Sequence, residues 1–378
     1  MSRIKGFFLL FPFFLFSHDW ITSFEESSFP VDITLLMIEV KYDDSKGVKI
    51  CEIQPVCHSS FFGFDYVYQD YGLMGKKIAN YLLQFGKKFW FMNPAVSHKP
   101  VREQFRLQGW KSFSDWNHLF LRKDQAYLNG DPYDIGSYSD IVYAKLKNRQ
   151  EASCFCRNFP KALLVDRAIV PYMYDKGLQN SLFLKDPCLE KIKPKWALFE
   201  KKYHPLLARE IVEKIAPDSG VVVIKPTSAD RGKGVIIVTA QELDLILQKI
   251  LLSPSSYSQD LDRGYNYWHE DKASFFVVEE FIQTKPLMVN QALFDTTFRM
   301  AAAFVYHQKK IHLHFLGSYC NLGDIPIDHP GSLNQKYKTS LLLDQTIRTP
   351  EEIEQKIYQE LSRPLTVLYQ KMLYCVEK

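Results

Sequence analysis

Several common signatures are missing from this sequence of 378 residues. Its seven cysteines include no repeated CxxC and no Cys/His spacing typical of a metal site, which favours a reducing compartment over a disulfide framework. There is no internal repeat and no low-complexity tract. The 47 basic and 43 acidic side chains leave a formal charge of only +4 and form no basic stripe, so we expect no nucleic-acid partner.

What is present is ample material for a large core, with 46% hydrophobic and 15% aromatic residues, and the length suggests two or three domains. Near the N-terminus, Arg3 and Lys5 precede the apolar run "GFFLLFPFFLFS", which has the length of a signal-peptide core but is too short to span a membrane. Pro12 interrupts it and no small-x-small cleavage site follows. We expect a buried segment of a cytoplasmic protein; the alternative is export or membrane association through residues 6–17.

Hydrophobic periodicity predicts a mixed α/β (α+β) chain with antiparallel sheets and flanking helices. The charged stretch "CLEKIKPKWALFEKKYHPLLAREIVEKIA" is expected to be helical with a break near Pro194. The other expected elements are a hairpin over Asp32–Gln54, strands in "KKFWFMNP", "SDIVYAKL" and "KALLVDRAIV", helices in "GKKIANYLLQFG" and "QELDLILQKILL", a strand over Phe275–Ile282, a hairpin around Gln308–Lys310 and a helix near residues 350–375.

The stretch "VVVIKPTSADRGKGVIIVTA" predicts a hairpin whose tip is rich in glycine and basic residues. A Walker P-loop is excluded, because Lys233 is followed by Gly234 and a strand rather than by Ser or Thr and a helix. Gly232 and Gly234 allow the backbone to approach a ligand, Arg231 and Lys233 supply positive charge, and Lys225 ends the first strand. Such a flap suits a polyphosphate, although an ordinary solvated turn has the same composition.

A second hairpin brings two carboxylates together. If its turn is centred between Ser45 and Lys46, the register places Glu39 opposite Glu52, and Gln54 shares their face because strand side chains alternate. Opposed like charges destabilise a hairpin unless a cation or solvent separates them. Two carboxylates and an amide oxygen are ligands that magnesium takes, and the alternative is that both acids point to solvent.

The order of strand, flap, strand, helix, a strand ending in "EEFI" and then "FDTTFR", over roughly residues 195–320, resembles the ATP-grasp superfamily. That resemblance implies ATP as cofactor and an adenine-binding hinge at Glu279–Ile282. It implies that ATP is bound by Lys225, Ser228, Gly232, Gly234, Glu279, Glu280, Phe281 and Ile282, and that Arg231, Lys233 and Arg299 are catalytic. For Arg299, an ion pair with Asp295 is the structural alternative. The same segment also resembles tubulin-tyrosine-ligase-like enzymes.

An ordinary ATP-grasp domain ends in a Glu-x-Asn motif, and none follows Arg299. The early hairpin, with "KICEIQ" and a Ser/Gly loop at Ser59–Gly63, instead resembles the circularly permuted type found in eukaryotic-type glutathione synthetase and glutathionylspermidine synthetase, whose metal hairpin precedes the flap. The resemblance implies a permuted ATP-grasp fold with Mg²⁺ on Glu39, Glu52 and Gln54. Two positions depart from the family: Glu39 replaces an aspartate and Gln54 an asparagine.

The implied activity is an ATP- and Mg²⁺-dependent ligation, in which a small-molecule or peptide carboxylate is activated as an acyl phosphate and captured by an amine. The alternatives are a degenerate nucleotide-binding or interaction protein and a kinase-like enzyme with a hydroxyl acceptor. The predicted division is residues 1–63 with the metal hairpin, residues 64–190 as a mixed α/β substrate or linker region, and residues 191–378 with the flap, the hinge and the C-terminal helix.

Overall fold

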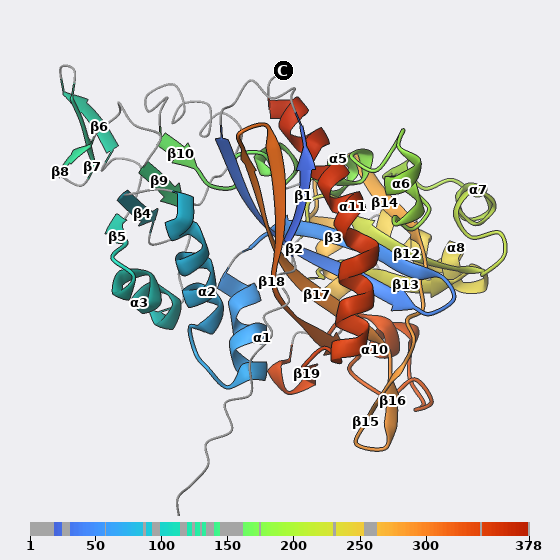
Figure 1. Cartoon of the computed structure of the whole chain (residues 1–378). Coiled ribbons are helices and arrows are strands. Elements are labelled where there is room, and N and C mark those ends of the chain that lie inside the picture. Colours follow the sequence, from blue (N-terminus) through green and yellow to red (C-terminus); the bar gives the residue numbers. More distant parts are fainter. Residues whose placement is uncertain are drawn as a thin grey trace, which may run out of the picture.

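The structure is a computed structural model of the whole chain. The elements described below are identified by the labels in Figure 1. The residues that the structure describes are 19–24, 31–56, 58–85, 88–92, 99–113, 119–122, 125–128, 131–133, 140–143, 162–173, 175–229, 232–252, 263–340 and 342–376. The apolar N-terminal run and Arg231 lie outside these residues.

The chain is a mixed α/β protein with antiparallel sheets and helices on their faces, as predicted. Its largest sheet has the strand order β1-β18-β17-β2-β3, with β19 also paired to β18. Strands from both ends of the chain therefore share one sheet. A circularly permuted fold would need this arrangement, but the permutation itself stays a prediction. The strands are β1 (Asp19–Ser23), β2 (Val31–Asp43), β3 (Gly47–Pro55), β17 (Thr296–His307), β18 (Lys310–Leu322) and β19 (Thr346–Ile347).

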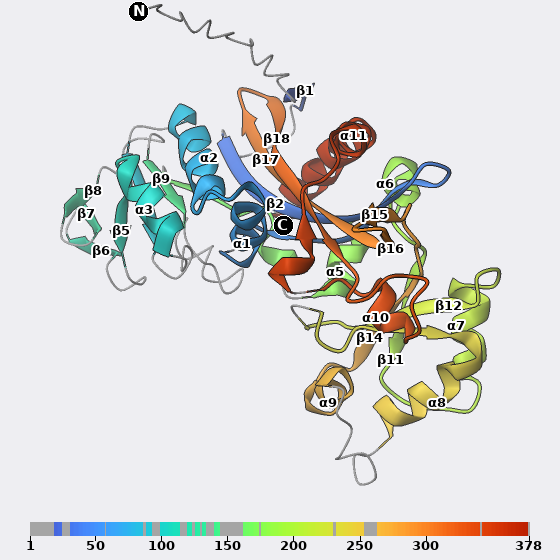
Figure 2. The same ribbon diagram turned by 90° about the horizontal axis from the view of Figure 1, so that it is seen from below.

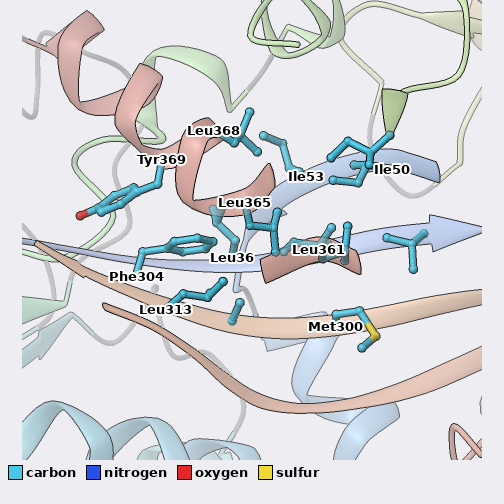
Figure 3. Close-up of a cluster of buried hydrophobic side chains, with 14 of the residues drawn as sticks. Leu36, Ile50, Ile53, Met300, Phe304, Leu313, Leu361, Leu365, Leu368 and Tyr369 are labelled. Carbon is cyan, nitrogen blue, oxygen red and sulfur yellow. The ribbon is translucent and has the colours of Figure 1, made fainter. Parts of the chain in front are cut away.

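Both faces of the large sheet are covered, because β2 is apolar on both sides over most of its length. Leu36 and Ile38 belong to the cluster under the long C-terminal helix α11 (Glu351–Val376), which supplies Leu361 and Leu365 (Figure 3). The alternate residues, such as Leu35, pack with α1 (His58–Tyr68) and α2 (Leu73–Leu82) on the opposite face. This packing explains why the sheet needs helices from both ends of the chain.

The predicted flap hairpin is confirmed and belongs to a second, four-stranded antiparallel sheet with the order β11-β14-β12-β13. Helix α8 buries Leu243, Leu247 and Ile250 on one side, as its periodicity predicts. The elements of this flap sheet are β11 (Trp196–Glu200), α7 (Leu207–Ile215), β12 (Val221–Pro226), β13 (Ile236–Thr239), α8 (Ala240–Leu251), α9 (Arg263–Glu270) and β14 (Phe275–Glu280).

The middle of the chain lies on the other side of the large sheet from the flap sheet in both views (Figures 1 and 2). It contains a four-stranded parallel sheet, β10-β9-β4-β5, and a three-stranded sheet, β6-β7-β8, and its predicted strands in "KFWFM" and "DIVY" are confirmed. The elements are β4 (Lys88–Met92), α3 (Lys99–Leu107), β5 (Lys111–Phe113), β6 (Leu119–Arg122), β7 (Gln125–Leu128), β8 (Asp131–Tyr133), β9 (Asp140–Tyr143) and β10 (Ala162–Leu164).

Short elements connect these parts. Three-residue 3₁₀ turns lie at Leu83–Phe85, Val170–Tyr172 and Leu343–Gln345, and the remaining elements are α5 (Lys176–Ser181), α6 (Pro187–Lys191), β15 (Leu287–Val289), β16 (Ala292–Phe294) and α10 (Leu333–Tyr337). The hairpin around Gln308 and the C-terminal helix are confirmed. The division at residues 63 and 190 stays a prediction.

Two sequence expectations are wrong. The segment "WALFE", predicted as part of a helical stretch, is strand β11, because pairing with the edge of β14 outweighs its local helix propensity. The expected Ser/Gly loop at Ser59–Gly63 lies within helix α1. Gly63 is needed there for packing, since a Cβ at this position would come within 2.5 Å of the Tyr319 ring. Within the described residues, no helix is both long and apolar enough to cross a membrane.

Candidate active site

A row of polar side chains crosses the large sheet from β18 to β3. The register places Tyr319 beside Arg299, Arg299 beside Glu39, and Glu39 beside Glu52. The Arg299 guanidinium lies 2.6 Å from Glu39 Oε1 and donates to the Tyr319 hydroxyl at 3.2 Å. The Gln54 amide approaches the same Glu39 oxygen at 3.4 Å. The predicted pairing of the two glutamates is thus confirmed, and their charges are separated by protein cations rather than by solvent alone.

This pairing depends on a β-bulge that the sequence did not reveal. At the turn, Asp43 pairs with Gly47, which is one residue away from the predicted register. The register then shifts between Glu39 and Val40, because Cys51 is an extra residue on β3. Without the bulge, Glu52 would share the face of Ile50 and point into the core under α11. The bulge therefore places Glu52 on the face of Glu39.

The flap sheet meets the large sheet at this bulge. Lys193 Nζ donates to the carbonyl oxygens of Ile50 and Cys51 at 3.2 and 3.3 Å, and Lys225 Nζ lies 3.5 Å from the Cys51 oxygen. Both ammonium groups also pair with one buried carboxylate, that of Glu279, at 2.9 and 2.5 Å. The carbonyls at the bulge thus receive donors from β12 and from the segment before β11, and the two sheets are joined by charged groups.

Helix α5 closes the group from a third side. Lys176 Nζ lies 2.8 Å from Glu52 Oε1, and Asn180 Nδ2 donates to Glu279 Oε1 at 3.0 Å. Asp175 caps the helix by accepting from the backbone N–H of Leu178 at 3.0 Å. In total, four cationic side chains surround three carboxylates, those of Glu39, Glu52 and Glu279.

Burial and the neighbouring charges oppose one another at these carboxylates. Burial alone would raise the pKa of Glu279, but Lys193 and Lys225 overcome it and lower that pKa to about 2. Burial likewise opposes ionisation of Glu52, and the charge and hydrogen bond of Lys176 lower its pKa. Desolvation lowers the pKa of Lys193 despite the charge of Glu279. The group is therefore a charged network in which removal of one member leaves another charge buried.

Sequence reasoning missed Lys176 and Lys193. A signal for Lys193 was present, because the tripeptide Ile-Lys-Pro occurs twice, at Ile192–Pro194 and Ile224–Pro226, and both lysines contact Glu279. Lys176 had no such signal, since it lies in a short helix whose place beside β3 comes from tertiary packing.

The predicted flap residues lie in a loop that contacts α9 and the residue after it. Ser228 Oγ donates to Asp271 at 3.0 Å, and the indole N–H of Trp268 donates to the Gly234 carbonyl at 2.8 Å. Gly232 and Gly234 have φ of 67° and 68°. Lys233 is exposed. The glycines thus allow the turn, and their predicted roles toward ATP stay predictions, as does that of Arg231, which lies outside the described residues.

The predicted hinge follows β14. The Glu279 side chain points into the lysine pair, so its carboxylate does not face a nucleotide as a free group. The Glu280 N–H donates to the Lys195 carbonyl at 2.7 Å, the Phe281 ring packs edge-on against Tyr337, and Ile282 is buried. The role of this segment in holding adenine stays a prediction.

The structural alternative for Arg299 is wrong, because Asp295 is held by Lys41 and by the Thr284 hydroxyl. Among the residues that the structure describes, no group of three or more His, Cys, Asp or Glu side chains is arranged to hold a metal. Glu39 and Glu52 supply two carboxylates at most, and Gln54 supplies the neighbouring amide.

No protein-family model matches the chain, and no curated protein matches it in sequence. Among solved structures, D-alanyl-alanine synthetase A from Vibrio cholerae is 8% identical with a TM-score of 0.38, over 76% of this chain and 81% of that one. N5-carboxyaminoimidazole synthetase from Staphylococcus aureus is 11% identical with a TM-score of 0.33, over 77% and 95%. A RimK domain protein ATP-grasp from Sphaerobacter thermophilus is 11% identical with a TM-score of 0.29, over 77% and 100%. TM-scores below 0.5 define neither the fold nor the activity of this chain.

Proposed function

We propose that the chain is an ATP- and Mg²⁺-dependent carboxylate–amine ligase of the permuted ATP-grasp type. One observation carries the proposal: Lys225 of the flap sheet and Lys193, just before β11, both reach the bulge carbonyl of Cys51, the residue before Glu52 of the carboxylate pair. The sequence resemblance requires these two parts to meet, although they are about 170 residues apart along the chain. Such a meeting does not follow from either motif alone.

The charges in the group suit a polyphosphate. Four cations face three carboxylates, and the two lysines on Glu279 are nearly excluded from solvent, so an anion entering here would be bound in a medium where charge–charge attraction is strong. Lys193 and Lys225 would hold phosphate oxygens, and Arg299, whose buried Nε has no hydrogen-bond partner among the described residues, would orient a carboxylate or phosphoryl oxygen.

The donor set also fits a divalent cation in part. Glu39 and Glu52 face each other and Gln54 lies beside them, so their oxygens would hold Mg²⁺ once Lys176 leaves Glu52. When bound, the ion would offset the negative charge that repels an incoming carboxylate. In the reaction, a substrate carboxylate oxygen forms a bond to the γ-phosphorus as the bond to ADP breaks, and an amine then displaces phosphate from the acyl group.

The competing proposal is a nucleotide-binding protein without ligase activity. The observation that favours it is that both carboxylates already have internal cations, Glu39 with Arg299 and Glu52 with Lys176, so the site is electrostatically satisfied without a metal. The ligase proposal requires magnesium for the chemical step, whereas the binding-protein proposal requires it for nucleotide binding at most.

Nucleotide binding is tested with Lys225→Ala. Loss of a charged contact inside a partly dry site should weaken ATP binding by about 2 kcal/mol, or roughly 30-fold, in calorimetry with magnesium. Lys195→Ala is the matched control, because that lysine is exposed directly before β11. Equal ATP affinity of wild type and Lys225→Ala would place the nucleotide elsewhere.

Ligation is tested by an ADP-release screen across amino acids, polyamines and short peptides. With a substrate from the screen, Glu52→Gln should abolish magnesium-dependent turnover while part of the ATP affinity remains, and Gln54→Asn should preserve or raise activity. If wild type binds ATP but no substrate stimulates ADP release, and Glu52→Gln binds ATP equally well, the binding-protein proposal is correct.

A further inference from the structure

Lys176 links three parts of the candidate site. Its ammonium pairs with Glu52 at 2.8 Å, and its backbone N–H donates to the carbonyl of Thr227, the first residue after β12, at 2.9 Å. Its side chain is 11% exposed, whereas that of Glu52 is 26% exposed. Lys176 is therefore held between the base of the flap loop and the open side of the carboxylate pair.

The carboxylate pair needs positive charge whether or not a metal is bound. Glu39 and Glu52 are directly opposed on neighbouring strands, an arrangement that like charges destabilise. Each one has its own protein cation, Arg299 for Glu39 and Lys176 for Glu52. These two cations occupy oxygens that a divalent cation bridging the pair would need.

The two cations are not equally able to leave. Arg299 stands on the central strand β17, contacts both Glu39 and the Tyr319 hydroxyl, and carries a planar guanidinium. Lys176 has a flexible four-carbon stem and lies in α5, a helix of six residues at the sheet edge. Lys176 is thus the cation that can swing off its carboxylate without moving a strand.

We infer that Lys176 is an internal counter-cation of Glu52 that must be displaced before a divalent cation binds, so that cation binding is conditional on a polyphosphate. The inference rests on the proposed function. The charge of Lys225 acts on Glu52, so a polyphosphate held by Lys225 lies within electrostatic reach of the Lys176 ammonium and offers it another anion. Lys176 is a positioning residue: its ion pair holds Glu52 in place, and it couples entry of the metal to entry of the phosphate.

The test uses Mn²⁺ alone as the probe, with free Mn²⁺ measured by its paramagnetic resonance signal on the full chain without nucleotide. Lys176→Met removes the competing charge, so it should bind Mn²⁺ about tenfold more tightly than wild type. Lys195→Met, at an exposed lysine outside the network, should bind like wild type. Affinity of Lys176→Met equal to or weaker than that of wild type would overturn the inference.

Thermal melting covers the case in which Lys176→Met is poorly folded, because loss of the ammonium leaves two carboxylates in repulsion. Mn²⁺ should raise the melting temperature of Lys176→Met more than that of wild type, and the extra gain should vanish in the Lys176→Met/Glu52→Gln double variant. A Lys176→Met chain that stays unfolded at saturating Mn²⁺ would also count against the inference.

These outcomes are separable from the fate of the proposed ligase. If wild type turns over a substrate but Lys176→Met gains no Mn²⁺ affinity, the counter-cation role fails and the ligase stands. If Lys176→Met gains affinity but no substrate stimulates ADP release, the counter-cation role stands and the ligase fails.

Discussion

At the scale of single residues, two buried carboxyl groups have pKa values shifted in opposite directions, although burial raises both. Glu279 is 3% exposed and stays charged because two lysines contact it. Asp166 is 5% exposed; burial and the nearby Asp32 raise its pKa to about 8, although its oxygen accepts the Leu35 N–H. Neither behaviour follows from residue type, since both depend on which charges share the buried site.

Glu279→Gln should lower stability at neutral pH by about 3–5 kcal/mol, because Lys193 and Lys225 would face each other without a counter-charge. The pKa of Glu279 falls from its usual 4.5 to about 2, so the stability it contributes is complete above pH 4.5 and is lost as the pH falls toward 2. Denaturant melts at pH 7, 4.5 and 3 measure the free energy of unfolding. It should fall more steeply with decreasing pH in wild type than in the variant, which lacks this carboxylate. Parallel stability–pH curves below pH 4.5 would contradict the prediction.

Asp166→Asn should act at the other end of the pH scale. A pKa raised from 3.8 to about 8 contributes stability that is complete below pH 3.8 and is lost as the pH rises through 8. Asparagine keeps the acceptor for Leu35 and tolerates the positive φ of 69° at this position. The variant should match wild type near pH 4 and exceed it by on the order of 2 kcal/mol at pH 9. Thermal melts of both proteins at the two pH values check this. A stability difference between variant and wild type that is the same at pH 4 and pH 9 would refute it.

At the scale of elements, the flap loop is shaped by close packing at its second glycine. A Cβ at Gly234 would come within 2.5 Å of the Pro226 ring, which ends β12, whereas a Cβ at Gly232 would meet, among the described residues, the flexible end of Lys338 at 3.3 Å. Both glycines have positive φ. A side chain at either position would therefore have the same backbone strain from the positive φ. Only at residue 234, within the described part of the chain, would it also clash with a neighbouring ring.

Gly234→Ala should destabilise the base of the flap by more than Gly232→Ala. The left-handed conformation costs each variant about 1–2 kcal/mol, and the contact with Pro226 adds to this only at residue 234. Hydrogen exchange of the β12–β13 amides and the melting temperature check the order, with Gly232→Ala as the matched control. Equal loss in both variants would show that the Pro226 contact relaxes freely.

At the scale of the whole molecule, the large sheet depends on both ends of the chain. β17 lies between β18 and β2, and α11 packs on Leu36, Ile38 and their neighbours from β2 (Figure 1). The carboxylate pair comes from the N-terminal hairpin, whereas Arg299 and Lys225 come from the C-terminal half. The same strand pairing therefore forms the sheet and brings the residues of the candidate site together.

A fragment of residues 191–378 should not fold cooperatively alone. It lacks β2, so β17 has an open edge and the apolar face of α11 loses part of its partner surface. Limited proteolysis and denaturant melts of the fragment, compared with the full chain, measure this. A fragment that melts cooperatively with protected β17 amides would show that the C-terminal part is an independent domain.

The sequence by itself determined the local elements that carry strong hydrophobic periodicity. The β-branched runs of the flap and the apolar side of α8 are short-range properties, set by side-chain alternation in strands and by helical spacing.

Only the tertiary structure decided which charges meet. The predicted turn was one residue out of register, and the bulge at Cys51 is what keeps Glu52 on the face of Glu39. β11 is a strand because β14 offers it an edge, Arg299 pairs with Glu39 because β17 lies beside β2, and Lys176 reaches Glu52 from a helix about 120 residues away. The physical reason is that hydrogen-bond pairing and burial of charge depend on neighbours that are distant in the chain, and no local periodicity records them.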